Sequence, residues 1–443
     1  MKFASPRLIA LFSGLFVLPL AYSVDAPAAT APAANTNPNN LGKDAHGNPL
    51  RRAPRTGHIS NYDENKVGQY TLPDPLILAN GQRIDNADTW LNQRRPEILK
   101  LYQSQFYGRV PDSVPAVTFA KDTDESVMLN DTAVIHRHGV VTIGEGERAV
   151  HVNVHYYLPP HAKSAVPVLL HLTFATNTAG PATAPATASG PARPSEAGPI
   201  ADILGRGFGY ALVRYTEIQP DNADTHSSGV QALAYKAGQT QPQPDEWGTV
   251  ATWAWGVSRV LDFLATDSAI DAKRIALMGH SRLGKTALWA GASDPRFALI
   301  FSSCAGEMGS SLARRDYGES LDDMTGNFGW QFAGNLQQYA GRWNDLPVDA
   351  HMLIALSAPR PVFITGGTED QWADPKGEFL AEVAAGPVYR LLGKKDLGTT
   401  ELPPLDTPLI EGDLGFHYHT GGHTITASDW KAFLTFATRH LNP

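Results

Sequence analysis

The chain alternates between short apolar runs and longer segments that carry an apolar stripe at helical spacing. The apolar runs lie at 166–174, 209–218, 274–280, 297–304, 359–367 and 414–421. The helical stripes lie at 85–107, 246–267, 281–292, 376–393 and 428–441. Strands without polar alternation, separated by helices, predict a mostly parallel sheet that is covered on both faces. The strand-like segments at 140–144 and 149–158 are expected to extend this sheet as antiparallel N-terminal strands. The fold class predicted is therefore α/β, a three-layer sandwich.

The first 45 residues differ in composition from the rest of the chain. Residues 1–23 carry Lys2 and Arg7, then an apolar run that is short for a membrane span, followed by small residues. This pattern predicts a secretory signal peptide, with an anchoring helix as the alternative. Residues 24–45 are rich in Ala, Pro, Thr and Asn and are expected to be a disordered linker. Residues 46–443 are expected to form a single catalytic domain, with a surface loop at 175–195.

Composition narrows the function classes. The 443 residues are 42% hydrophobic and 18% charged, with a formal net charge of −8 and no basic block. Nucleic-acid binding by charge is therefore not expected, because phosphate recognition needs clustered Lys and Arg. Cys304 is the single cysteine, so the chain cannot form an internal disulfide. We expect a secreted or periplasmic monomer that does not associate with membranes once the signal is removed.

The segment GHSRLGK, Gly279 to Lys285, places a serine between a predicted strand and a predicted helix. Gly279, Ser281 and Gly284 form G-x-S-x-x-G, one residue longer than the common nucleophile-elbow pattern. By itself this motif is weak, and Ser281 could be an ordinary loop serine. At a strand-to-helix turn of an α/β sheet it indicates a nucleophile, which is the arrangement of the α/β-hydrolase fold.

A serine nucleophile needs a base and an acid that orients the base. In this fold they follow in the order serine, acid, histidine. His423 lies after the last predicted strand and before the last helix, and it is the expected base. Asp370 is favoured as the acid, with Glu369 beside it and Glu307 after an earlier strand as alternatives.

Three histidines, His417, His419 and His423, lie close together in the sequence. They could form a zinc cluster, but no cysteine or carboxylate triad accompanies them. Packed or hydrogen-bonded strand histidines are the expected explanation for His417 and His419. We expect no metal and no cofactor.

The motif and its surroundings resemble the glucuronoyl esterases, carbohydrate esterase family 15, in their bacterial branch. The resemblance rests on GHSRLGK and extends from about residue 66 through YTLPDPL (70–76), EWGTVATWAWGVSRVLDFL (246–264), EDQWADP (369–375) and GFHYHTGGHTITASDW (415–430). It implies that Ser281 is the nucleophile, His423 the base and Arg282 a group that helps to hold the oxyanion. It also implies that Lys285, Glu319 and Trp372 bind the sugar. Without the resemblance these would be a helix lysine, a surface carboxylate and a core tryptophan.

One position departs from the family pattern. Many members carry the catalytic glutamate shortly after the strand that ends here at SSC, where this chain has Cys304. Some bacterial members instead carry the acid after the later strand, at the place of Asp370. The departure favours Asp370, and Cys304 is expected to be a small buried hydrophobic residue. The second oxyanion donor is expected in the loop 173–177.

The resemblance implies hydrolysis of esters of 4-O-methylglucuronate on glucuronoxylan, with lignin alcohols as leaving groups. Lignin–carbohydrate fragments would then be the binding partners. An acetyl xylan or feruloyl esterase on the same fold is the first alternative. A catalytically silent carbohydrate-binding protein is an alternative of another class.

Overall fold

The central feature of the computed structural model is a nine-stranded sheet in the order β11-β10-β9-β8-β6-β7-β5-β4-β3. Neighbouring strands from β11 to β7 run parallel, and β5, β4 and β3 continue the sheet in antiparallel pairs. The structure describes Met1 and residues 39–129, 132–174 and 198–443.

The strands of this sheet are β3 (Val117–Leu129), β4 (Thr132–Ile143), β5 (Val150–Leu158), β6 (Val166–Thr173), β7 (Gly209–Arg214), β8 (Ile270–His280), β9 (Phe297–Ser303), β10 (Val362–Gly367) and β11 (Leu414–His419). The α-helices are α1 (Ala87–Thr89), α2 (Arg95–Leu101), α3 (Ile200–Gly205), α4 (Tyr215–Ile218), α5 (Gly229–Leu233), α6 (Thr249–Leu264), α7 (Arg282–Ser293), α8 (Leu321–Gly326), α9 (Ala350–Ala355), α10 (Pro375–Leu391) and α11 (Ala427–Leu441).

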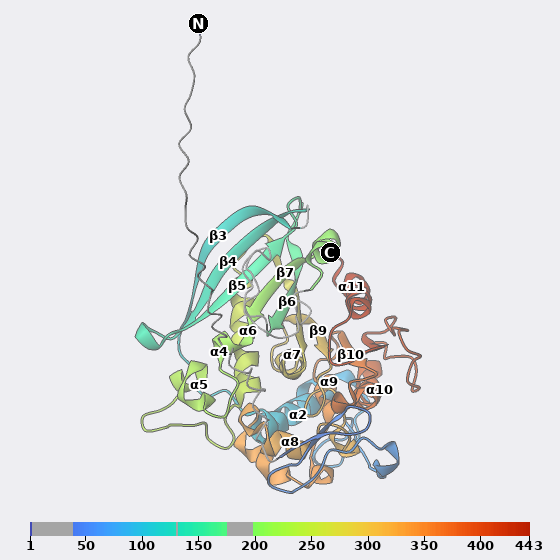
Figure 1. Ribbon diagram of the computed structural model, residues 1–443. Coiled ribbons are helices and arrows are strands. Elements are labelled where there is room, and N and C mark those ends of the chain that lie inside the picture. The colour runs from blue at the N-terminus through green and yellow to red at the C-terminus, as the bar shows by residue number, and fades with distance from the viewer. Residues whose placement is uncertain (2–38, 130–131, 175–197) are drawn as a thin grey trace. The chain divides into compact units, whose positions relative to one another are not determined.

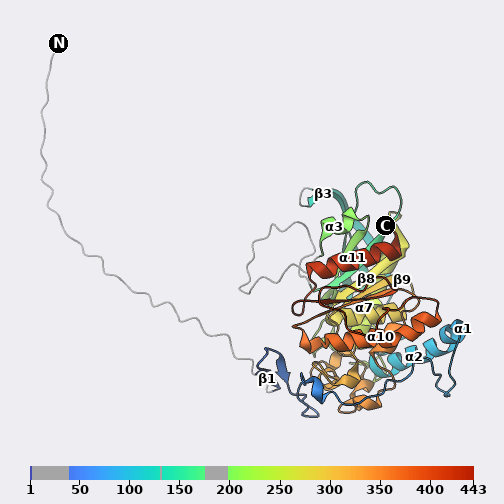
Figure 2. The same cartoon turned by 90° about the vertical axis from the view of Figure 1, so that its right-hand side faces the viewer.

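Helices cover both faces of the sheet, so two separate apolar cores form. Along β8, Ile275 and Leu277 belong to the core shared with α6, α7, α9 and α10, while Ala276 and Met278 belong to the core shared with α3 and α11. This alternation follows from the two-residue period of a strand. Figures 1 and 2 show the layers, with α11 on one side of the sheet and α7 and α10 on the other. The prediction of a three-layer α/β sandwich is confirmed.

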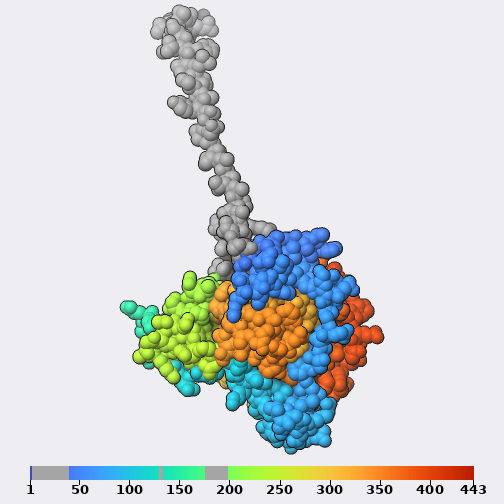
Figure 3. Space-filling model, turned by 90° about the horizontal axis from the view of Figure 1, so that it is seen from below, coloured from blue at the N-terminus to red at the C-terminus, as the bar shows by residue number. Residues whose placement is uncertain are grey.

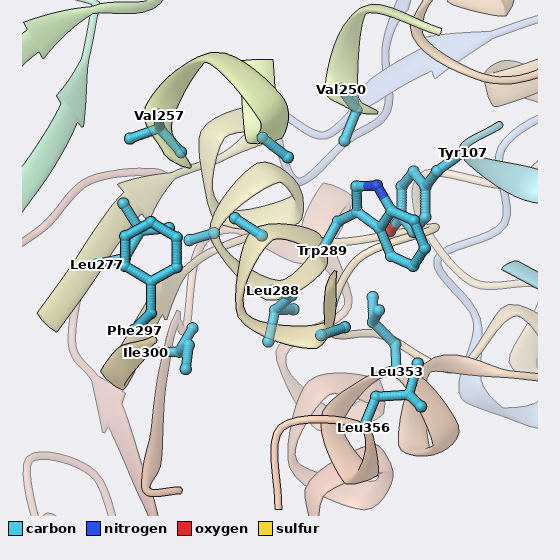
Figure 4. Packing of buried hydrophobic residues seen from close by; sticks show 14 of the residues in the cluster. Tyr107, Val250, Val257, Leu277, Leu288, Trp289, Phe297, Ile300, Leu353 and Leu356 are labelled. Atoms are coloured by element: carbon cyan, nitrogen blue, oxygen red, sulfur yellow. The ribbon is translucent and has the colours of Figure 1, made fainter. Parts of the chain in front are cut away.

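The larger core fixes the helix that follows the predicted nucleophile. In α7, Leu288 faces the sheet, and the Trp289 ring stacks on the Tyr107 ring with centroids 4.9 Å apart (Figure 4). The Tyr107 hydroxyl donates to the carbonyl of Met308, in the loop after β9. Aromatic contacts of this kind contribute beyond their buried area. Packing on Tyr107 and on the larger core therefore holds the second half of α7, where Leu288 and Trp289 lie.

The sequence prediction missed β3 altogether and truncated β4. β3 is the edge strand, it pairs only with β4, and its sequence VTFAKDTDESVML is mostly polar because most of its side chains face solvent. The run 209–218 is also not one strand: β7 ends at Arg214, and Tyr215–Ile218 forms α4. Ile218 packs against Gly256 of α6 so closely that a Cβ there would lie 2.5 Å from Ile218 Cγ2.

A small hairpin precedes the main sheet. β1 (Asn40–Lys43) pairs antiparallel with β2 (Pro49–Arg51). β1 therefore occupies the end of the segment 24–45 that the sequence predicts as a linker, and the residues from Asn39 onward form one unit. The predicted signal peptide and residues 24–38 lie outside the described residues, apart from Met1. None of the described helices combines the length and the apolar character that a membrane span requires.

Candidate active site

Ser281 stands in the strained turn between β8 and α7. Its φ is +57° and its ψ is −131°, a conformation that L-residues adopt only when the surroundings impose it. Its N–H donates to the carbonyl of Ser303 on β9 at 2.8 Å. The flanking glycines are required by space: a Cβ at Gly279 would lie 2.2 Å from the Leu283 oxygen, and one at Gly284 would lie 2.9 Å from Ser302 Oγ. The spacing G-x-S-x-x-G is thus a consequence of this tight turn.

His423 lies in the turn after β11, and its side chain is 39% exposed. Its Nδ1 is 2.6 Å from Asp370 Oδ2, and the Asp370 side chain is only 4% exposed. With Nδ1–H donating to the carboxylate, the lone pair of the neutral ring is on Nε2. His423 and Ser281 line the same pocket, so an imidazole with a free acceptor nitrogen shares one cavity with the strained serine.

Asp370 reaches His423 because β10 and β11 are parallel neighbours whose carboxyl ends meet. Two hydrogen bonds between the turns after β10 and β11 hold this register. The Glu369 N–H donates to the Gly421 carbonyl at 2.8 Å, and the Gly421 N–H donates to Thr368 Oγ1 at 3.1 Å. The Glu369 side chain is exposed. Of the two adjacent acids, Asp370 is the one whose side chain contacts the histidine.

Glu307, the third acid considered, is buried and forms no contact with His423. Burial, with further contributions from Asp349 and Glu319, raises the pKa of Glu307 well above its ordinary value. This shift favours the protonated form of the carboxyl group, which carries no charge. It therefore lacks the charge that an orienting acid supplies to an imidazolium.

Cys304 follows β9 and is 1% exposed, as predicted for a small buried residue. The Cys304 Sγ, an Asp370 carboxylate oxygen and a ring nitrogen of His423 all lie within 4.8 Å of one another. Among the described residues, this is the group with spacing suited to a metal ion. Burial raises the pKa of the Cys304 thiol well above its usual value, which disfavours the thiolate that a metal would need.

Arg282 is the first residue of α7, and its side chain lines the pocket. Its Nη1 donates to Asp221 Oδ2, and its guanidinium lies 5.9 Å from the Phe174 ring centroid. Asp221 also accepts from Trp330 Nε1 at 2.9 Å, Gln331 Nε2 at 3.2 Å and the Tyr215 hydroxyl at 3.2 Å. This buried carboxylate therefore fixes the direction in which Arg282 points.

Three residues that the resemblance assigns to sugar binding form one chain of hydrogen bonds. Lys285 Nζ donates to Glu319 Oε2 at 2.8 Å, and Trp372 Nε1 donates to Glu319 Oε1 at 3.2 Å. The Lys285 and Glu319 side chains are largely buried, and all three residues line the pocket with Ser281 and His423. Residues from distant parts of the chain thus meet at one cavity of about 210 Å³.

The pocket also contains residues that the sequence reading did not identify: Arg51, Phe328 and Gln331. Asp221, behind Arg282, was missed as well. Asp221 follows the predicted strand 209–218, and polar residues beyond the carboxyl ends of parallel strands gather at one edge, so this rule could have found it. No comparable signal marks Arg51, Phe328 or Gln331. The predicted loop donor falls on Thr173 and Phe174, which the structure describes, and on residues 175–177, which lie outside the described residues.

His417 and His419 do not join His423. Both rings contact the buried carboxylate of Asp429, with His417 Nδ1 at 2.7 Å and His419 Nδ1 at 3.1 Å from Oδ1. His417 and His419 are therefore hydrogen-bonded strand histidines, as the sequence predicts. The zinc alternative is not supported: His417 and His419 share Asp429, His423 contacts Asp370, and the three histidines do not form a group with metal-ligand spacing among the described residues.

Asp429 gives a prediction about stability. Burial alone would raise its pKa, but the hydrogen bonds from His417 and His419 lower the pKa of Asp429 to about 2. A carboxyl whose pKa is depressed on folding stabilises the protein above the unfolded pKa, and this stabilisation is lost as pH falls through the folded value. We expect Asp429→Asn to lower the free energy of unfolding at pH 6 by about 3 kcal/mol, and to flatten the decline of stability between about pH 4 and pH 2. Urea denaturation at several pH values, with the exposed Ser428→Ala as control, measures both. Equal stability of the variant and the wild type at pH 6 would contradict the prediction.

Comparison with known proteins identifies the family. Residues 209–393 match the family model described as glucuronyl esterase, fungi. A carbohydrate esterase from an unknown prokaryotic organism is 40% identical over 402 residues, covering 86% of this chain and 92% of the relative. The 4-O-methyl-glucuronoyl methylesterase 1 of Wolfiporia cocos is 30% identical over 344 residues, covering 73% of each chain. The solved structure of a carbohydrate esterase family 15 glucuronoyl esterase from Teredinibacter turnerae superimposes with a TM-score of 0.78 at 35% identity, covering 88% of this chain and 95% of that one.

The alignments with the two relatives and with the solved structure extend over most of the chain, and the family-model match lies within the same region. The sheet order, the serine turn after β8 and the histidine after β11 are those of the α/β-hydrolase fold. The chain belongs to the glucuronoyl esterases of carbohydrate esterase family 15.

Proposed function

We propose that this protein is a serine esterase that hydrolyses esters of glucuronic acid and 4-O-methylglucuronic acid. The observation that carries the proposal is the shared pocket of Ser281, His423 and the Lys285–Glu319–Trp372 chain. It combines a nucleophile and its base with buried polar groups and an aromatic ring on the acyl side. A relative that bears the name 4-O-methyl-glucuronoyl methylesterase supports the same substrate class.

In the first half of the reaction, His423 Nε2 removes the hydroxyl proton of Ser281 as Oγ attacks the ester carbonyl carbon. Asp370 holds the ring through Nδ1 and stabilises the imidazolium that forms. The tetrahedral intermediate collapses when the bond to the alcohol oxygen breaks and His423 gives its proton to the leaving alcohol. The product of this half is a glucuronoyl-serine ester.

In the second half, His423 removes a proton from water, and the hydroxide attacks the acyl carbon. The bond from the carbonyl carbon to Ser281 Oγ breaks, Oγ takes the proton back, and the uronic acid leaves. Both tetrahedral intermediates carry an oxyanion. Arg282 supplies charge-assisted donors to it, together with backbone amides at the start of α7. The Asp221 contact supports this role, because a guanidinium held in one direction need not reorganise when the charge develops.

The acyl side of the pocket suits a sugar. Lys285 and Glu319 are bound to each other and provide donors and acceptors for ring hydroxyls, and Trp372 offers an aromatic surface against which a sugar face can stack. Buried polar groups of this kind discriminate strongly, since a substrate without the matching hydroxyls leaves them unpaired. We also propose that the chain is exported to the periplasm or to the outside of the cell, where its substrates are ester links between glucuronoxylan and lignin alcohols.

A substrate comparison with matched leaving groups tests the proposal. We expect kcat/KM for benzyl glucuronate to exceed that for benzyl acetate by at least about 100-fold, because both release the same alcohol and differ only on the acyl side. Acetylated xylan and methyl ferulate complete the panel. Hydrolysis confined to acetyl or feruloyl substrates would overturn the uronate assignment in favour of another esterase activity. Absence of any ester hydrolysis, with binding to xylan retained, would instead indicate a carbohydrate-binding protein.

A further inference from the structure

A segment outside the family resemblance reaches into the substrate pocket. Arg51, at the end of β2, lines the pocket together with Phe328 and Trp372. Its guanidinium carbon lies 4.9 Å from the Trp372 ring centroid and 5.5 Å from the Phe328 ring centroid. The sequence resemblance to the family begins at about residue 66. Arg51 is therefore a pocket residue that the family motifs do not include.

The backbone around Arg51 is fixed to the loop that carries Glu319. The Arg51 N–H donates to Ser60 Oγ at 3.1 Å, and the Ser60 N–H donates to the Arg51 carbonyl at 3.1 Å. One residue further on, the Asn61 carbonyl accepts from the Gly318 N–H at 2.7 Å. In Figure 3 the N-terminal segment, in blue, lies against the orange part of the surface. These bonds hold the backbone of Arg51 and of its neighbours beside the loop that carries Glu319.

The three cations of the pocket differ in their partners. Arg282 is paired with Asp221, and Lys285 is paired with Glu319. Within the described chain, Arg51 has no carboxylate at ion-pair distance, and no described acceptor takes a hydrogen bond from its guanidinium. A guanidinium stacked on aromatic rings keeps its N–H donors in the plane and available. Arg51 is thus the cation of this pocket whose charge and donors are left for a ligand.

We propose that Arg51 is a substrate-binding residue for the acyl half of the ester. Its in-plane N–H groups donate to oxygen atoms of the uronate unit, and its positive charge favours the uronic acid product, whose carboxylate is ionised at neutral pH. This inference rests on the proposed function. It adds a residue that determines specificity and that comes from the N-terminal hairpin. The other proposed substrate-binding residues come from segments later in the chain.

The matched pair Arg51→Met and Arg52→Met tests this. Methionine keeps an unbranched apolar stem over Trp372 and removes the charge and all donors, and Arg52 is the exposed neighbour that does not line the pocket. We expect Arg51→Met to raise KM for benzyl glucuronate by about tenfold, with kcat changed by less than about twofold. The inhibition constant of free glucuronate is expected to rise as well, while kcat/KM for p-nitrophenyl acetate stays at the wild-type value. Arg52→Met is expected to behave as wild type in every assay.

The outcomes separate this inference from the proposed function. If the wild type hydrolyses benzyl glucuronate and Arg51→Met leaves KM and glucuronate inhibition unchanged, the inference is overturned and the proposed function stands. If the variant loses uronate and acetate hydrolysis in equal measure, Arg51 has a structural role and the inference is again overturned. If the wild type hydrolyses no uronate ester, the proposed function fails and the inference fails with it. Should Arg51→Met not fold, Arg51→Lys gives the same readout, with an intermediate rise in KM expected because the charge remains and the planar donors are lost.

Discussion

Replacement of Ser281 by alanine is expected to lower kcat for a glucuronate ester by at least about 10⁴-fold. Alanine keeps the Cβ, so the strained turn at the start of α7 can persist while the nucleophilic oxygen is gone. His423 and Asp370 then have no hydroxyl to activate, and the remaining groups only stabilise direct attack by water. The measurement is steady-state release of benzyl alcohol from benzyl glucuronate, with enough enzyme to detect 10⁻⁵ of the wild-type rate.

The control for this variant is Ser293→Ala, the same substitution at the opposite end of α7, where the hydroxyl donates to the Trp289 carbonyl at 2.7 Å. It is expected to retain wild-type kcat. The Ser281→Ala protein should still bind free glucuronate, because the sugar-side residues are untouched. Residual activity above about 1% of wild type, in a preparation free of contaminating esterase, would exclude Ser281 as the nucleophile.

Replacement of Asp370 by asparagine is expected to reduce kcat by about 10³- to 10⁴-fold. The amide has nearly the same shape, so it can still contact His423 Nδ1, but its NH₂ group can donate to that nitrogen. The ring proton then moves to Nε2, the atom that must accept the proton from Ser281. The charge that stabilises the imidazolium is also lost. Benzyl glucuronate hydrolysis across the pH range measures the effect.

The two other acids considered from the sequence serve as controls for Asp370. Glu369→Gln changes the adjacent, exposed carboxylate, and Glu307→Gln replaces a carboxyl whose pKa is raised by burial. Both are expected to keep kcat within about twofold of wild type. A loss in Glu369→Gln as large as that in Asp370→Asn, or an Asp370→Asn variant with more than a tenth of wild-type kcat, would show that another group orients the histidine.

Cys304 and Asp370 lie beside the same ring of His423, although they follow different strands. The thiol follows β9 and Asp370 follows β10, and the Cys304 Sγ, an Asp370 carboxylate oxygen and a ring nitrogen of His423 lie within 4.8 Å of one another. β9 and β10 are parallel neighbours, so their carboxyl ends open on the same side of the histidine turn. A carboxylate from either strand can therefore reach the same imidazole. In this chain the β9 position holds a protonated thiol and the β10 position holds the carboxylate.

The layered fold and the serine turn follow from local rules that can be read in the sequence. Buried strands without polar alternation indicate a covered parallel sheet. The two glycines around Ser281 indicate a tight turn, in which a Cβ at Gly279 would collide with backbone atoms and one at Gly284 with the Ser302 side chain. The sequence did not predict β3, because an edge strand exposed to solvent needs no apolar pattern. Its stability comes from pairing with β4.

Only the tertiary structure shows which acid contacts His423 and which residues line the pocket. Glu369 and Asp370 are adjacent in sequence, and only the register of β10 against β11 determines which side chain faces His423. Asp221 and Arg51 lie 60 and 230 residues before Ser281 in the sequence, and no motif links either of them to it. Their roles depend on where the chain folds back, because a hydrogen bond or an ion pair is fixed by distance in space, and a one-dimensional pattern holds no record of that distance.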